Sequence, residues 1–148
     1  MIKKIINNME DFVPFEIAKN LKEKGFREGC FGYYGYCKDV FYYNVIQNPI
    51  PSRQLTFKDF KDCKNRYREN NRYDAPTISQ VLKWLRDEKD IDLVTSPVFF
   101  YDDVLGKMRK YECEVFTPSL DKPEHCGYRE EWEQATLAGI EYVLDNLI

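Results

Sequence analysis

The sequence lacks the short motifs that most enzyme classes carry. Its 148 residues include only seven glycines and one histidine. The glycines form neither a phosphate-binding loop nor a dinucleotide-binding fingerprint, both of which need closely spaced glycines before a helix. His125 lies in the segment DKPEHCG, which reads as a loop, and its neighbour Cys126 need not face it. We therefore expect no catalytic residues and no cofactor, and we rank an enzyme of unidentified class last.

The cysteines also lack a recognisable pattern. Their number is five, which is odd, and no spacing between them repeats. A disulfide framework normally uses an even set in a small secreted chain, and structural zinc sites use short paired spacings. We therefore expect reduced thiols and no metal site. The cysteines are Cys30, Cys37, Cys63, Cys113 and Cys126.

Long hydrophobic runs are missing as well. The opening segment MIKKIINNMEDF has only a two-residue apolar run before Asn7, which is too short for the core of a signal peptide. No run approaches the length that crosses a bilayer. The formal net charge of −3 is too small to indicate a partner. These features predict a cytoplasmic protein with no membrane partner.

Two segments in the first two thirds of the chain have helical periodicity. The first runs from Pro14 to Lys24; proline suits the first helical position, and Gly25 supplies a left-handed stop. The second covers residues 75–89, where Thr77 and Gln80 form a capping-box pattern before an apolar face. We predict a helix in each.

A third helix is predicted from Tyr128 to Leu147, where apolar residues recur every three or four positions. Gly139 lies in the middle of it, although glycine costs about 1 kcal/mol there relative to alanine. We therefore expect Gly139 to allow close approach to a neighbouring element. Trp84, in the second helix, is interpreted as a packing residue.

Two further segments have the pattern of β-hairpins. Residues 30–46 are rich in aromatic and β-branched residues, with a Lys38-Asp39 turn between the arms. Residues 91–116 read as a second hairpin, and its second arm alternates. Alternation predicts one buried face and one solvated face. The two faces are Tyr111, Cys113 and Val115, and Lys110, Glu112 and Glu114.

The element order is therefore α-ββ-α-ββ-α, which predicts a single α+β domain over residues 1–148. Its architecture would be a four-stranded antiparallel sheet, made of the two hairpins, with three helices packed on one face. A proline-containing loop that can hold an extra helix is expected at residues 47–74.

Three stretches of the chain resemble a known family. They are FEIAKNLKEKGF, APTISQVLKWLRDEKDIDLV and EEWEQATLAGIEYVLDNLI. Together they are similar to short uncharacterised proteins common in Bacteroides and in their phages and mobile elements. The likeness covers about half the chain and departs in residues 49–73. It implies a phage or mobile-element origin and no activity.

The tyrosines of the first hairpin are the favoured binding surface. Neighbouring residues alternate across a strand, so some of these rings should lie on the open side of the sheet, where tyrosine suits an interface. The alternative is that they only stabilise the strands through cross-strand pairs. The leading hypothesis is a non-enzymatic protein that binds a host or phage protein or forms a homodimer. The interface candidates are Tyr33, Tyr34, Tyr36, Tyr42 and Tyr43.

A second hypothesis is nucleic-acid binding through the basic and aromatic segment 58–73. If residues 57–69 are helical, their cations form a short ridge, although the same charges suit an ordinary solvated helix. The low isoelectric point, about 5.3, argues against nucleic acid. The candidates are Lys58, Lys61, Lys64, Arg66 and Arg68.

Overall fold

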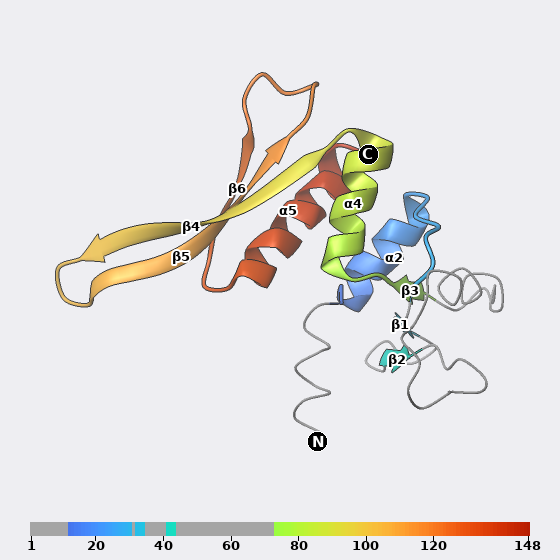
Figure 1. The fold of residues 1–148 in the computed structure, drawn as a ribbon, viewed down its shortest axis with the longest axis horizontal. Coiled ribbons are helices and arrows are strands. Elements are labelled where there is room, and N and C mark those ends of the chain that lie inside the picture. Colours follow the sequence, from blue (N-terminus) through green and yellow to red (C-terminus); the bar gives the residue numbers. More distant parts are fainter. Residues whose placement is uncertain (1–11, 31, 35–40, 44–72) are drawn as a thin grey trace, which may run out of the picture. The chain divides into compact units, whose positions relative to one another are not determined.

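The computed structural model describes residues 12–30, 32–34, 41–43 and 73–148. The chain divides into two compact units, residues 1–77 and 78–148, and each is described by itself. The elements are labelled in Figure 1. They are α2 (Phe15–Glu23), β1 (Gly32–Tyr34), β2 (Phe41–Tyr43), β3 (Tyr73–Ala75), α4 (Ile78–Lys89), β4 (Asp92–Asp102), β5 (Gly106–Phe116), β6 (Glu124–Arg129) and α5 (Trp132–Asn146).

The first unit holds a three-stranded antiparallel sheet in the order β2-β1-β3, with α2 packed against β3. Tyr33 of β1 lies opposite Tyr42 of β2 and Asp74 of β3. The pairing of β1 with β2 confirms the first hairpin. Strand β3 was not predicted, because three residues are too few to show an alternating pattern.

Helix α2 is one residue shorter at each end than its sequence predicts, and both predicted end residues are its caps. Pro14 is its N-cap residue, and Ile17, Ala18 and Leu21 form its buried face. Gly25 has a φ of 91°, a left-handed conformation that glycine adopts without strain. The turn there lets the Phe26 N–H donate to the Leu21 carbonyl at 2.9 Å, and Phe26 itself is buried.

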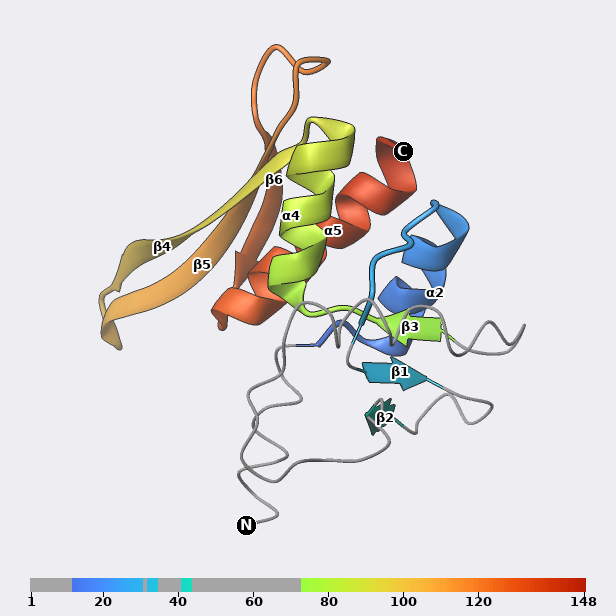
Figure 2. The ribbon, with the colours of Figure 1, turned by 45° about the vertical axis from the view of Figure 1, so that its right-hand side comes forward.

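The second unit is built on the β4–β5 hairpin, which has the predicted position. Its register runs from Asp92 opposite Phe116 to Asp102 opposite Gly106, and β6 pairs with the other side of β5. Figure 2 shows α4 and α5 on one side of these strands. Helix α4 buries Trp84 together with Leu85, as expected of a packing residue.

Helix α5 approaches the sheet closely through Gly139. A Cβ atom at this position would collide with the Cys113 sulfur and would lie 2.8 Å from Leu93 Cδ2. The close approach predicted for Gly139 is therefore confirmed. Beside this contact, the hydroxyls of Thr95 and Thr136 lie 2.7 Å apart, and Thr136 also donates to the Trp132 carbonyl.

The α+β class and the three helices are confirmed for the described residues, although the third helix begins at Trp132 and its predicted start, Tyr128, belongs to β6. The single four-stranded sheet is wrong. The strands form two sheets, β2-β1-β3 and β4-β5-β6, because each hairpin gains a third strand of its own. The three helices accordingly do not share one sheet face. Whether residues 1–148 act as one domain stays a prediction. Apart from β3, the expected loop and extra helix at 47–74 lie outside the described residues. No described helix is long and apolar enough to cross a membrane.

Candidate functional site

The two faces of the β4-β5-β6 sheet differ in what they carry. Cys113 and Val115 of β5 are fully buried on the face that α5 covers. The residues between them on the strand point to the other side, as strand alternation requires. That side, called the open face here, carries Val94, Glu112, Glu114, His125 and Tyr128.

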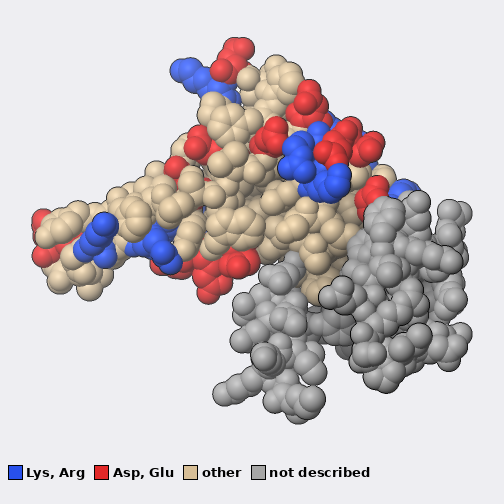
Figure 3. All heavy atoms as spheres, viewed as in Figure 1, with Lys and Arg blue, Asp and Glu red and all other residues tan. Residues whose placement is uncertain are grey.

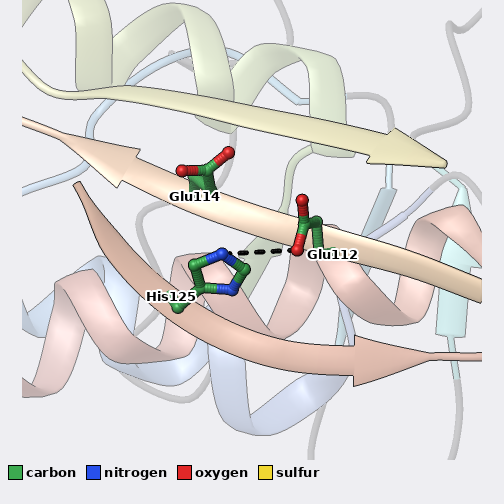
Figure 4. A group of neighbouring side chains, drawn as sticks. All are labelled: Glu112, Glu114 and His125. Carbon is green, nitrogen blue, oxygen red and sulfur yellow. Dashed lines mark ion pairs between the residues drawn. The ribbon is translucent and has the colours of Figure 1, made fainter. Parts of the chain in front are cut away.

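Three of these side chains lie close together, and Figure 4 shows the contact between two of them, His125 and Glu112. His125 Nε2 lies 3.3 Å from Glu112 Oε2, and one ligand atom of each of Glu112, Glu114 and His125 lies within 4.8 Å of the others. The side chain of Glu112 is only 16% exposed, whereas that of His125 is 50% exposed. The cluster is therefore partly sheltered by the strands and accessible through the imidazole.

A β-bulge sets this arrangement. Glu112 lies opposite Tyr128, and Glu114 lies opposite His125. Between these two pairs β5 has one residue, Cys113, whereas β6 has two. Gly127, at a φ of 80°, takes the left-handed conformation that such a bulge needs. The bulge puts His125 and Tyr128 on the same face although they are three residues apart. The expectation that His125 lies in a loop is thus wrong.

Aromatic rings border the cluster on one side. The Tyr128 ring lies edge-on to Phe100 of β4, with 4.9 Å between centroids, and 6.1 Å from the His125 ring. Edge-to-face contacts of this kind fix the orientation of the rings. They hold Tyr128 and His125 in place on the open face.

The distal part of the β4–β5 hairpin, residues 97–111, extends past α5 and is called the arm (Figure 1). Large apolar side chains are exposed along it: Phe99 is 56%, Tyr101 81%, Val104 91% and Leu105 74% exposed. Its turn is held by Asp102, whose Oδ1 accepts the N–H groups of Val104 and Leu105 at 2.8 Å. These bonds lower the pKa of the Asp102 carboxyl below its usual value.

The arm has a small excess of positive charge, three cations against two carboxylates, on an acidic unit. Residues 78–148 contain eight lysines and arginines against fifteen aspartates and glutamates, and three of the eight are Lys107, Arg109 and Lys110. Lys107 lies over the Phe99 ring at 4.4 Å and Arg109 over the Tyr111 ring at 5.2 Å. Figure 3 shows basic side chains along the arm and acidic ones both at its tip and gathered at its base.

The thiols of the second unit are not activated. Burial, followed by the charges of Cys113 and Glu124, raises the pKa of Cys126 to about 11, and burial also raises that of Cys113. A thiol with a raised pKa is protonated at neutral pH and is a poor nucleophile. Neither cysteine indicates thiolate catalysis.

The tyrosines proposed from the sequence are only partly described. The Tyr34 hydroxyl donates to the Val13 carbonyl at 2.9 Å, and its ring lies edge-on to Phe15. Burial raises the pKa of Tyr34. Its ring therefore packs within the first unit, and Tyr33 is half-buried. Tyr36 and the side chains of Tyr42 and Tyr43 lie outside the described residues, so the tyrosine interface stays a prediction.

The basic residues proposed to bind nucleic acid are not described by the structure either. All five lie in segment 44–72, outside the described residues: Lys58, Lys61, Lys64, Arg66 and Arg68. Nucleic-acid binding through them stays a prediction.

Comparison of the chain with protein-family models, curated proteins and solved structures finds no match. The resemblance to the Bacteroides phage and mobile-element proteins, and the origin that it implies, therefore stay predictions.

Proposed function

We propose that this protein is a non-enzymatic binding protein that acts by self-association, through the arm of the β4–β5 hairpin. The observation that carries the proposal is the exposure of Phe99 and Tyr101 on the arm. They lie on the sheet face that α5 covers at the root of the hairpin, around Thr95. On the arm, that face has no covering helix among the described residues of the unit.

A two-stranded ribbon with bare apolar faces is marginally stable in water. Contiguous exposed apolar patches of this kind mark interaction sites in soluble proteins. A layer packed over Phe99 and Tyr101 would therefore stabilise the arm in the way that α5 stabilises its root. This explains why a protein partner fits the arm better than a small ligand, for which the open ribbon offers no enclosed cavity.

Charge favours a second copy of this chain as the occupant. Lys107 and Arg109 lie on the arm, whereas Glu131 and Glu133 lie at its base, at the start of α5. If two arms pack face to face in antiparallel directions, the distal part of each meets the base of the other. Such a two-fold contact is self-complementary: cations of one copy face carboxylates of its partner in both halves of the interface.

The exposed edge of β4 favours a dimer in which two sheets pack face to face over one in which two sheets join edge to edge. β4 is an edge strand, and Pro97 in its middle has no N–H to donate to an added strand. Edge-to-edge pairing of two copies along β4 would therefore lose a hydrogen bond at its centre. Face-to-face packing requires no free N–H.

Sedimentation velocity over a concentration series tests the proposal. The wild-type chain is expected to shift from monomer to dimer, and Phe99→Ser to stay monomeric at concentrations where the wild type is dimeric. Phe116→Ser is the matched control, because Phe116 is an exposed phenylalanine at the other end of the same hairpin. It should dimerise like the wild type.

A charge exchange sharpens the test. Lys107→Glu and Glu131→Lys should each weaken the dimer, and the two together should restore it, because each pair across the interface then has opposite charges again. The Glu131 side chain makes no capping hydrogen bond to α5, so replacing it removes no hydrogen bond from the start of the helix. A wild-type chain that stays monomeric at every concentration would refute self-association.

A further inference from the structure

We propose that Glu112, Glu114 and His125 form a binding site for one divalent transition-metal ion, of which zinc fits best. The site lies on the open face of the β4-β5-β6 sheet and does not depend on the arm. It uses no cysteine, so it is a different kind of site from the cysteine-based zinc sites for which the sequence has no pattern. Its donors are two carboxylate oxygens and one imidazole nitrogen, drawn from two neighbouring strands.

The distances suit a tetrahedral ion. Zinc binds nitrogen and oxygen ligands at about 2.0–2.2 Å, which puts two ligands of a tetrahedron about 3.4 Å apart. The separation of His125 Nε2 from Glu112 Oε2, 3.3 Å, already has this value. A ligand atom of Glu114 lies within 4.8 Å of both, so a change of side-chain rotamer that moves this oxygen by at most about 1.4 Å brings it to the same centre. The strands need not move.

The charges also favour a cation. Glu112 and Glu114 lie two residues apart on one strand, on the same face, and repel one another. Lys110, the basic residue next to them on that face, is paired with Glu130 at 3.2 Å. Within the described part of the chain, the Glu114 carboxylate takes part in no hydrogen bond or ion pair. A divalent ion would compensate both carboxylates, which a single imidazole does not.

The donor set selects the kind of ion. Calcium and magnesium prefer six or more oxygen ligands, whereas imidazole together with carboxylate suits zinc and its first-row neighbours. Three protein ligands leave a fourth tetrahedral position open. The Tyr128 ring lies beside the cluster, and the exposed side of His125 opens that position to solvent.

The histidine makes the proposal directly testable, because His125 is the only one in the chain. Its ring signals in a ¹H–¹⁵N NMR spectrum of the full chain report on this site alone. Zinc that binds to cysteines elsewhere would not shift them. Titration with zinc chloride is expected to shift these signals and to saturate at one equivalent per chain. Cobalt(II) in place of zinc should give a d–d spectrum without thiolate charge-transfer bands.

Variants separate the ligands from their surroundings. Glu114→Gln and Glu112→Gln should each weaken zinc affinity by about 100-fold, since loss of even an outer-shell partner costs 10–100-fold. Glu124→Gln is the matched control: Glu124 precedes His125 on β6, pairs with Val115, and belongs to the opposite face. The zinc affinity of Glu124→Gln should equal that of the wild type.

Two results would overturn the proposal. One is that the His125 ring signals do not move at millimolar zinc, whether or not zinc binds elsewhere. The other is that Glu114→Gln and Glu124→Gln lose affinity equally, which would indicate a general charge effect in place of a site.

Discussion

The two halves of the β4–β5 hairpin share one strand pairing but have opposite surroundings. At its root, Cys113 and Val115 are fully buried beneath α5. On the arm, Phe99 and Tyr101 occupy the same face and are exposed. The strands are continuous, so the difference is due to the helix, which covers only part of their length. We infer that the root holds the fold and that the arm is free to bind.

Gly139→Val should strongly destabilise the covered half. Any side chain at this position collides with Cys113 and Leu93, so we expect a loss of about 3 kcal/mol in the free energy of unfolding. Urea unfolding measures this loss. Ala138→Val, one residue away on the same helix and only half-buried, is the control and should lose less than about 1 kcal/mol. Equal losses would mean that α5 does not pack closely at Gly139.

Ile140→Ala and Phe99→Ala compare the halves directly. Ile140 is fully buried, so its truncation should cost about 3 kcal/mol of unfolding free energy. Phe99 is exposed, so its truncation should change the stability of the monomer by less than about 0.5 kcal/mol. Measurement at low protein concentration excludes any contribution from association. A large loss in Phe99→Ala under these conditions would show that the arm is part of the core.

Thr136→Val tests the polar contact beneath the root. It removes the hydroxyl that lies 2.7 Å from the Thr95 hydroxyl, and we expect a loss of about 1–2 kcal/mol in the free energy of unfolding. Thr95→Val combined with Thr136→Val should recover part of this loss, because neither hydroxyl of the pair then remains. Additive losses in the double variant would contradict a coupled pair.

The smallest effect concerns the turn of the arm. The lowered pKa of Asp102 means that its carboxylate stabilises the turn above the ordinary pKa of 3.8, and that this contribution is lost as the pH falls through the lowered value. The amide signals of Val104 and Leu105 should therefore move in an acid titration. In Asp102→Ala the acid-dependent movement should vanish, whereas Asp103→Ala should retain it.

The sequence reveals the helices and the long hairpin because their patterns are long and regular. Ile17, Ala18 and Leu21 repeat at helical spacing before Gly25, and the alternation of residues 110–115 marks β5. Strand β6 was missed because it is short and its bulge at Gly127 breaks the alternation. Whether one sheet or two would form depends on these third strands, so it could not be read from local pattern.

The candidate site was visible only in part for the same reason. The alternation places Glu112 and Glu114 together on a solvated face, and this could be predicted. His125 joins them only through the register of β6, which the bulge shifts. A signal that could have found it is the isolated Gly127 in a short polar segment, since such a glycine often marks a bulge.

The most direct test of the contrast between root and arm is amide hydrogen exchange measured at low and at high protein concentration. Root amides such as those of Cys113 and Val115 should be protected equally at both concentrations. Amides of the arm, around Phe99 and Tyr101, should exchange faster at low concentration and gain protection at high concentration, as a second copy covers them. Protection of the arm that is the same at every concentration would contradict the account.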